Sequence, residues 1–469
     1  MVLITTLFYF TGFSQNAIKG RAIYKSIQYL SADELKGRWP GTAGDSLAEK
    51  YIINAFKKSG IAPLFPKYIQ PFEVTVKLDA PATENEIVFG NSVRLKINNQ
   101  YSIFPFSGDG SVTAKVVSGT TNDIVLHSQK NSQPVWMVLW RQKPFAPASD
   151  SLSDYALSNR ALLCGAVGVI LISPDTLDKK DVLVRLRPRN DKPLPIPVIQ
   201  VTRTAWKHIE HELFDQLQGA DIDRRVSDRT LTGTVRIRHQ TIVARNIAGI
   251  IKGNDPQLQN EYIVLGAHYD HLGFGGYGTG SLQPDTTAIH NGADDNASGT
   301  AALLAIAKAL QRNRTQLKRS VIVIAFAAEE EGLLGSRYFT DHLPVPQAAI
   351  RVMLNMDMVG RLNTENQLYM GGAGTFPGGV AFMKGLGEGA GLNLVVHAGG
   401  VGGSDHVSFY RKGISCMGLH TGGHLQYHTP SDDASWINVR GIEKVARYIY
   451  RAVAGLSVRE DNWGFIRQD

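Results

Sequence analysis

The sequence predicts an α/β fold in which a mostly parallel central sheet is flanked by helices and interrupted by an inserted β-rich lobe. From about residue 242 onward, apolar strand-like runs alternate with amphipathic helical segments, as in a parallel sheet covered on both faces. Between about 70 and 235, short alternating strands predominate and only one or two helices are expected. A chain of 469 residues, 43% of them hydrophobic, is long enough for two or three domains with sizeable cores.

These patterns divide the chain into four segments. We expect a signal peptide at 1–15, a helical segment of the main domain at 16–70, the β-rich insert at 71–238 and the rest of the main domain at 239–469. The run from Val2 to Phe13 is too short to span a bilayer and resembles the apolar region of a secretory signal, although the first basic residue is Lys19. A buried strand or helix is the alternative. A signal peptide implies a secreted or periplasmic protein, and no other stretch predicts stable membrane insertion.

Two helices are expected in the segment 16–70. The first covers SIQYLSADELKGR, with Ser31 as its N-cap and Glu34 completing a capping box. The second covers DSLAEKYIINAFKKSGI and ends at Gly60, since glycine readily adopts the left-handed conformation that closes a helix.

Charge and cysteine content exclude several classes of function. The net charge is 49 − 42 = +7, but the basic residues are scattered, so no nucleic-acid partner is predicted. Cys164 and Cys416 fall in different predicted domains and neither has a CxxC context, so both are expected to be small buried residues without a disulfide. The insert carries no cluster of His, Cys or carboxylates, and we assign it no chemistry.

Five side chains of metal-binding type follow predicted strands of the main domain. They are His268 in GAHYD, Asp295 in GADDNASG, Glu330 in AFAAEEEGLLGS, Asp357 in NMDMVG and His428 in YHTPSDD. Ends of strands are where open α/β sheets keep their chemistry. Two histidines and three carboxylates suit two divalent ions, and zinc is the best match.

Each of these motifs also has an ordinary structural explanation. Asp295 could cap a helix, His428 could lie in a surface turn, and Glu329 to Glu331 could form a solvated loop. Asp357 is different, because an ionised Asp inside an apolar strand is costly without a cation. The functional interpretation separates two roles: one of these Glu residues binds a metal ion, and its neighbour accepts a proton from a water molecule.

Supporting residues are also expected around the five ligands. Asp270, two residues after His268, is placed to hold the second nitrogen of that ring, and Asp405 belongs to a helix start or to the surroundings of the ligands. Ser404 is a suitable N-cap for that helix. Further histidines rank below His428 because no carboxylate pattern accompanies them: His271, His290, His397, His420 and His424.

The joint order of these motifs resembles that of the co-catalytic zinc aminopeptidases. The intervals are 27 residues (295 − 268), 35 (330 − 295), 27 (357 − 330) and 71 (428 − 357). This family of zinc exopeptidases includes bacterial leucyl aminopeptidase and, among wider relatives, glutamate carboxypeptidase, the transferrin receptor and glutaminyl cyclase. The resemblance covers LSADELKGRWPGTAGDSLAEKYI and about 242 to 455. More loosely, ALLCGAVGVILIS and IPVIQV in the insert resemble a protease-associated domain.

The resemblance implies a zinc-exopeptidase fold (phosphorylase/hydrolase-like) and a role for each matching residue. Asp295 would bridge two Zn²⁺ ions, with His268 and Asp357 completing one site and Glu330 and His428 the other. Three further implied features are Glu329 as the general base, Tyr427 as a donor to the reaction intermediate (packing beside the turn being the alternative), and a cis peptide between Asp295 and Asn296.

The implied activity is hydrolysis of N-terminal residues from peptide substrates. A glutamate-carboxypeptidase-like or dipeptidase activity is the alternative, although the sequence shows no set of basic residues beyond Arg361 for acidic side chains. A glutaminyl cyclase would need one zinc, and a non-catalytic receptor would have lost ligands. The full ligand set disfavours both. The sequence leaves the oligomeric state open.

Overall fold

The computed structural model describes residues 17–90, 93–118, 134–143, 150–175, 178–187, 191–214, 225–276, 278–460 and 463–468. The expected signal peptide at 1–15 lies outside the described residues. Among the helices that are described, none combines the length and apolar character needed to cross a membrane.

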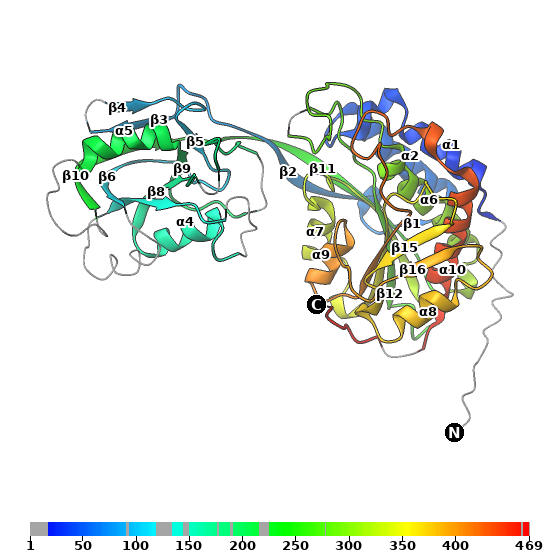
Figure 1. Ribbon diagram of the computed structural model, residues 1–469. Helices are drawn as coiled ribbons and strands as arrows, with labels where there is room; N and C mark the ends of the chain where they lie inside the picture. The colour runs from blue at the N-terminus through cyan, green and yellow to red at the C-terminus, as the bar shows by residue number, and fades with distance from the viewer. Residues whose placement is uncertain are drawn as a thin grey trace. The chain divides into compact units, whose positions relative to one another are not determined.

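The chain folds as two compact units, each with its own sheet (Figure 1). One unit comprises Met1–Val74 and Ile242–Asp469, and the other comprises Thr75–Thr241. Strands β2 (Ile69–Asp79) and β11 (Arg238–Ile251) pass from one unit to the other. The assignment of 71–238 as a protease-associated insert stays a prediction.

The sheet of the first unit has four adjacent parallel strands at its centre. Its nine strands among the described residues run in the order β1-β11-β13-β12-β14-β17-β15-β16, with β2 paired to β11. The pairs β13–β12, β12–β14 and β14–β17 are parallel, whereas β11–β13 and β15–β17 are antiparallel. The strands not yet bounded are β1 (Ala62–Pro63), β12 (Tyr262–His268), β13 (Ser320–Phe326), β14 (Ile350–Met356), β15 (Gln367–Gly371), β16 (Asn393–Val396) and β17 (Cys416–His420). The predicted α/β class is confirmed.

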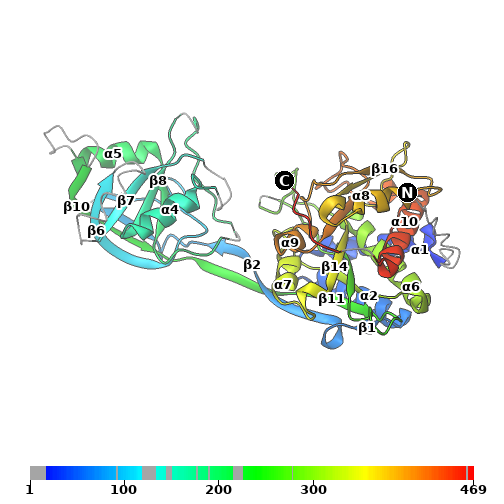
Figure 2. The same ribbon diagram turned by 90° about the horizontal axis from the view of Figure 1, so that it is seen from below.

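Helices cover both faces of this sheet (Figure 2). One face carries α1 (Gly20–Leu30), α2 (Ala43–Ser59), α6 (Gly299–Arg312) and α10 (Val439–Val458), and the other carries α7 (Leu334–Asp341) and α9 (His406–Arg411). A further helix, α8 (Gly379–Gly385), packs beside β16. Phe339 of α7 and Phe409 of α9 pack with Phe326 and Met353 of the sheet. Because both faces are covered, the central strands are apolar along their whole length rather than alternating.

The N-terminal helices differ in part from the expectation. The second helix is α2, which ends at Gly60 with φ 72° as predicted. The first helix ends at Leu30, so Ser31 follows a helix instead of beginning one, and its hydroxyl donates to Ile27 O at 2.8 Å. The predicted capping box does not form, since residues Asp33–Arg38 make a tight 3-10 segment. The contacts that hold this segment come from elsewhere in the chain and are described with the site.

The second unit contains a single described sheet with one helix on each face. Its eight strands within the described residues run in the order β4-β3-β10-β6-β7-β8-β9-β5. They are β3 (Glu86–Phe89), β4 (Val93–Leu95), β5 (Tyr101–Ile103), β6 (Gly110–Ser118), β7 (Val135–Trp140), β8 (Ala166–Ile172), β9 (Val198–Val201) and β10 (Arg225–Val235), with α4 (Asp154–Leu163) and α5 (Arg203–Phe214). Alternate residues of β8 enter different cores: Val169 packs with Leu157 of α4, and Ile170 packs with Trp206 of α5.

Both cysteines are free, as expected. Cys416 is buried, but Cys164 is only half-buried, contrary to the expectation, because it directly follows the end of α4.

Candidate metal centre

The five predicted ligands converge at the carboxyl ends of the parallel strands. His268 is the last residue of β12, Glu330 lies in the loop after β13, and Asp357 follows β14 directly. Asp295 lies in the turn before α6, and His428 lies in the loop after β17. Residues that span 161 positions of the sequence (428 − 268 + 1) therefore meet at one edge of the sheet, as expected for an open α/β fold.

Asp295 lies between two groups of potential ligands. Its Oδ1 is 3.3 Å from His268 Nε2, and its Oδ2 is 3.1 Å from His428 Nε2. On the first side, His268 Nε2 is also 3.4 Å from Asp357 Oδ1. On the second side, His428 Nε2 is also 3.3 Å from Glu330 Oε2. One carboxylate is thus shared between two sets of imidazole and carboxylate donors, which is the arrangement that two adjacent divalent ions require.

The electrostatics of the site fit bound cations. Burial lowers the pKa of His268, but the carboxylates of Glu329, Asp357 and Asp295 outweigh burial and raise this pKa well above its usual value. Burial likewise lowers the pKa of His428, while hydrogen bonds to Asp295 and Glu330 raise it to about 11. Without an ion, protons on the two rings balance the carboxylates. Divalent cations supply the same positive charge and leave the imidazoles neutral, as ligation requires.

The donor set identifies the kind of ion. Ligand atoms of His268, Asp295 and Asp357 lie within 4.8 Å of one another, and so do those of His271, Asp295 and Glu330. Imidazole nitrogen combined with carboxylate oxygen is a zinc-type set. The residues present therefore fit zinc.

Glu329 faces the same space as the ligands. Its side chain is 11% exposed, and its Oε2 is 4.0 Å from His268 Nε2. Burial raises the pKa of Glu329 well above its usual value, and the neighbouring carboxylates of Glu330 and Asp357 add to this effect. A carboxylate with a raised proton affinity beside potential metal ligands is suited to accept a proton from water.

The two histidine ligands are oriented by backbone carbonyls. His428 Nδ1 lies 3.0 Å from Gly280 O, so this nitrogen carries the proton and Nε2 is free to face the ligand site. His268 Nδ1 lies 3.3 Å from the carbonyl oxygen of Asp270. The glycine-rich loop that contains Gly280 also binds through Leu282 N to His428 O at 2.9 Å, so it borders the site.

Asp270 supports the site in a different way from the one expected. Its carboxylate is 3.9 Å from His268 Nδ1, beyond hydrogen-bonding distance. The two carboxylate oxygens instead accept hydrogen bonds from Glu329 N at 3.1 Å and Glu330 N at 3.2 Å. The backbone of Asp270 therefore orients the histidine, while its side chain holds the loop that carries Glu329 and Glu330.

Two further residues contact the predicted ligands: His271, which sequence reasoning ranked below His428, and Asp432, which it missed. His271 Nδ1 is 2.7 Å from Glu330 Oε1, closer than any His428 contact. The sequence signal for His271 is its position in the same strand-end loop as His268, and it justifies a higher rank for this residue. Asp432 Oδ2 accepts hydrogen bonds from the backbone nitrogens of Asp294 and Asp295, each at 3.0 Å. Its place in YHTPSDD, close to His428, gave no indication of this role.

Arg38 was also missed, and it explains the unexpected N-terminal turn. Its guanidinium is 1% exposed and donates to four carbonyl oxygens. They belong to Tyr269, Leu30, Asn291 and Gly292, at distances of 2.5 to 3.0 Å. The 3-10 segment thus places the Arg38 side chain so that it links the loop before Asp270 to the loop before Asp295.

Asp405 and Tyr427 lie near the ligands in different settings. Asp405 is fully buried, and burial raises its pKa to about 7. Ser404 does not cap α9 as expected, because its hydroxyl accepts a hydrogen bond from Asn355 at 2.8 Å. Tyr427 is 37% exposed and stacks on the His428 ring with centroids 3.8 Å apart. Its side chain can therefore serve either as a packing residue or as a contact for substrate.

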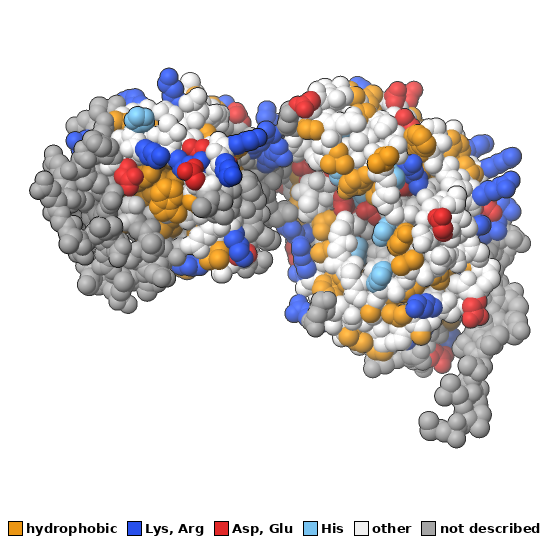
Figure 3. Space-filling view, viewed as in Figure 1, with side chains coloured by type: hydrophobic (Ala, Val, Ile, Leu, Met, Phe, Trp, Pro, Cys, Tyr) orange, Lys and Arg blue, Asp and Glu red, His pale blue; other side chains and the backbone are white. Residues whose placement is uncertain are grey.

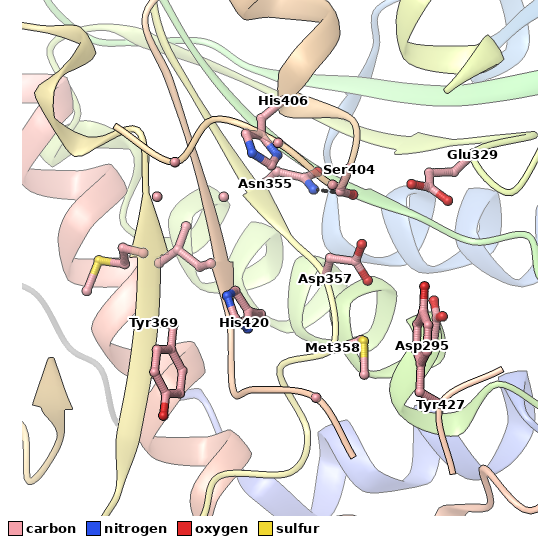
Figure 4. Close-up of a pocket in the computed structure, with 18 of the residues that line it drawn as sticks. Asp295, Glu329, Asn355, Asp357, Met358, Tyr369, Ser404, His406, His420 and Tyr427 are labelled. Carbon is pink, nitrogen blue, oxygen red and sulfur yellow. Dashed lines mark hydrogen bonds between the residues drawn. The ribbon is translucent and has the colours of Figure 1, made fainter. Parts of the chain in front are cut away.

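A cavity of about 420 Å³ opens onto this group (Figure 4). Asp295, Asp357, Glu329 and Tyr427 lie on one side of it, and Tyr369 and His420 lie on the other. Its described lining includes three carboxylates and no Lys or Arg. On the surface of this unit, histidine and acidic side chains are visible close together (Figure 3).

The turn that carries Asp295 has an unusual backbone. The peptide between Asp295 and Asn296 is cis, the conformation that the family resemblance implied.

Comparisons with known proteins agree on one family. Residues 246–453 match the description "Peptidase family M28". The aminopeptidase YwaD of Bacillus subtilis is 27% identical over 315 residues, which cover 64% of this chain and 60% of that protein. A probable leucine aminopeptidase 2 of Aspergillus fumigatus is 33% identical over 185 residues, which cover 38% of this chain and 33% of that protein. The chain thus spans less than two thirds of the length of these relatives.

Solved structures share the fold over nearly the whole chain. An aminopeptidase from Aneurinibacillus sp. strain AM-1 has a TM-score of 0.56 at 22% identity, covering 97% of this chain and 98% of the other. BSAP, a zinc aminopeptidase from Bacillus subtilis, has a TM-score of 0.54 at 20% identity, covering 94% and 96%. The match over 246–453, which contains every predicted ligand, confirms the predicted resemblance for this part of the chain: residues 246–453 match peptidase family M28.

Proposed function

We propose that this chain is an aminopeptidase that uses two zinc ions to hydrolyse the N-terminal residue from peptides. The observation that carries the proposal is the position of Asp295, whose two oxygens face His268 on one side and His428 on the other. Asp357 would complete the first zinc site and Glu330 the second. When bound, zinc polarises a carbonyl group and lowers the pKa of a water molecule.

The roles of the protein's own groups follow from their positions. Glu329 accepts a proton from water and later delivers it to the leaving amine, because it is a carboxylate of raised pKa that lines the cavity beside the predicted ligands. Asp270 holds the backbone of Glu329 so that its side chain stays aimed at the site. The Tyr427 hydroxyl donates a hydrogen bond to the oxygen on which negative charge develops.

The charge of the cavity supports recognition of an amino terminus. Asp295, Glu329 and Asp357 line the cavity without a Lys or Arg among its described residues, so a protonated amine is attracted and an acidic side chain is repelled. Arg361, the basic residue considered for acidic substrates, donates to Gln426 at 2.8 Å and lies over the Trp436 ring. This disfavours a glutamate-carboxypeptidase-like activity. The names of the relatives above point the same way.

The first experiment measures zinc per chain and the hydrolysis of a panel of amino-acid p-nitroanilides before and after chelation. We expect about two zinc ions per chain and loss of nitroaniline release on chelation, with recovery when zinc is returned. Two bound zinc ions without cleavage of any p-nitroanilide or peptide would contradict the proposal. One zinc per chain would favour cyclase chemistry.

We also propose that residues 1–15 act as a secretory signal and that 71–238 is a protease-associated insert. The apolar run and the motifs quoted above support these two assignments. Mass spectrometry of the N-terminus of the exported protein tests the first. Detection of intact Met1 on exported protein would contradict it.

A further inference from the structure

A second cleft adjoins the metal centre. It has a volume of about 510 Å³ and shares Glu329, Gly402 and Gly403 with the cavity described above. The rest of its described lining is Glu330, Gly332, Leu333, Val401, Val407 and Arg411. A substrate with its scissile bond beside Glu329 therefore has room on both sides of that residue, with the N-terminal residue in one space and the following residue in the other.

Arg411 is the one Lys or Arg in the described lining of either space. It is the last residue of α9 and is exposed. Its guanidinium forms no hydrogen bond or ion pair with any residue that the structure describes. The next residue, Lys412, is by contrast paired with Asp341 at 2.6 Å. The guanidinium of Arg411 is thus available to a ligand.

The position of this charge matters because the centre is acidic. Glu329 and Glu330 border the same cleft and repel a negatively charged group that enters it. The free carboxylate of a dipeptide lies one residue beyond the scissile bond, so it enters this cleft when the N-terminal residue occupies the first cavity. A guanidinium binds a carboxylate through two parallel hydrogen bonds and offsets the repulsion.

We propose that Arg411 binds the α-carboxylate of the residue that follows the scissile bond, so that the preferred substrates are dipeptides with a free carboxyl end. The apolar side chains of Leu333, Val401 and Val407 offer a surface for an apolar second residue. This inference rests on the proposed aminopeptidase function and narrows its substrate class.

The test compares a dipeptide acid with its amide, using the zinc-loaded full chain. The N-terminal residue is the one released fastest from the p-nitroanilide panel, and the second residue is leucine or leucinamide. For the wild type we expect kcat/KM for the acid to exceed that for the amide by about 10-fold, the size of one charged hydrogen-bonded contact. Arg411→Met should bring the ratio to one or below, because the repulsion from Glu329 and Glu330 remains. Arg411→Lys should leave an intermediate ratio, because a single ammonium lacks the planar fork of a guanidinium.

Lys412→Met is the matched control, since it removes a neighbouring exposed cation that lines neither space, and it should leave the ratio as in the wild type. The wild-type ratio should also fall as salt is added, because the contact is exposed. Equal cleavage of acid and amide by the wild type, or an unchanged ratio in Arg411→Met, would overturn the inference while leaving the aminopeptidase proposal intact. Failure of the zinc-loaded wild type to cleave either peptide or any p-nitroanilide would instead overturn the proposed function.

Discussion

Two groups of buried charges, one in each unit, are balanced in different ways. In the second unit, Arg141 and Asp154 form a bidentate pair at 2.9 and 2.7 Å, and Arg141 also donates to Ser173. The charge of each side chain balances that of the other, and together the two side chains join the end of β7 to the start of α4. In the first unit, Asp295 instead lies within 4.8 Å of the carboxylates of Asp357 and Glu330 and contacts histidines whose pKa values are raised.

The difference distinguishes a structural charge from a functional one. A buried pair of opposite charges needs no ligand to balance it, and removal of one partner is destabilising. A buried group with excess carboxylates is costly until cations enter. The excess of negative charge, more than burial or the short distances between side chains, therefore identifies the candidate metal centre.

The largest expected effect separates two adjacent residues of the metal centre. Glu329→Gln should lower kcat by about 10²–10⁴-fold because it removes the proton acceptor, while zinc content stays at the wild-type value. Glu330→Gln should instead lose zinc, because one ligand oxygen becomes an amide. Elemental analysis after dialysis, together with single-turnover rates, distinguishes the two variants. Zinc loss in Glu329→Gln would mean that Glu329 is a ligand.

Loss of the Arg141–Asp154 pair should lower the stability of the second unit. Asp154→Asn removes the bidentate carboxylate partner of the buried Arg141 guanidinium, so we expect a loss of about 3–5 kcal/mol in the free energy of unfolding of this unit. Denaturant unfolding followed by tryptophan fluorescence measures the change, since Trp136 and Trp206 are both in its core. Zinc content should remain unchanged. A loss below about 1 kcal/mol would show that the pair contributes little.

Asp45 is a third buried acid that extends this comparison. Among the described residues it is neither paired with a cation nor one of the predicted ligands. Asp45 accepts a hydrogen bond from Gly41 N at 2.9 Å, and burial together with the nearby charge of Glu49 raises its pKa to about 8. The folded state therefore holds a proton that the unfolded state releases near pH 4. Stability from this group is present at low pH and is lost as the pH rises through 8.

Asp45→Asn should remove this dependence, since a neutral amide can still accept the Gly41 hydrogen bond. Between pH 6 and pH 8, the wild type should lose roughly 2 kcal/mol of unfolding free energy relative to the variant, at about 1.4 kcal/mol per pH unit. Urea unfolding of the zinc-loaded proteins at several pH values provides the measurement. Parallel stability curves for the two proteins would contradict the raised pKa.

Much of the first unit could be predicted from local sequence. The central strands are continuous apolar runs because both faces of the sheet are covered, and α2 ends at a glycine with positive φ. The same reasoning predicts His268, Glu330 and Asp357, because a polar residue at or just after the end of a buried parallel strand lies at one edge of the sheet. Chain order alone thus indicated which carboxylates and histidines would meet.

Tertiary structure decided the rest. Ser31 and Glu34 carry a helix-start signal, yet the chain there turns so that Arg38 can donate to Gly292 O, 254 residues away. Asp432 binds the backbone of Asp295 from 137 residues away, and the carboxylate of Asp270 holds the loop of Glu329 instead of the His268 ring. Periodicity and capping preferences report only near neighbours in sequence. Hydrogen bonds between distant loops form only once the sheet has brought the loops together, so their partners have no local signature.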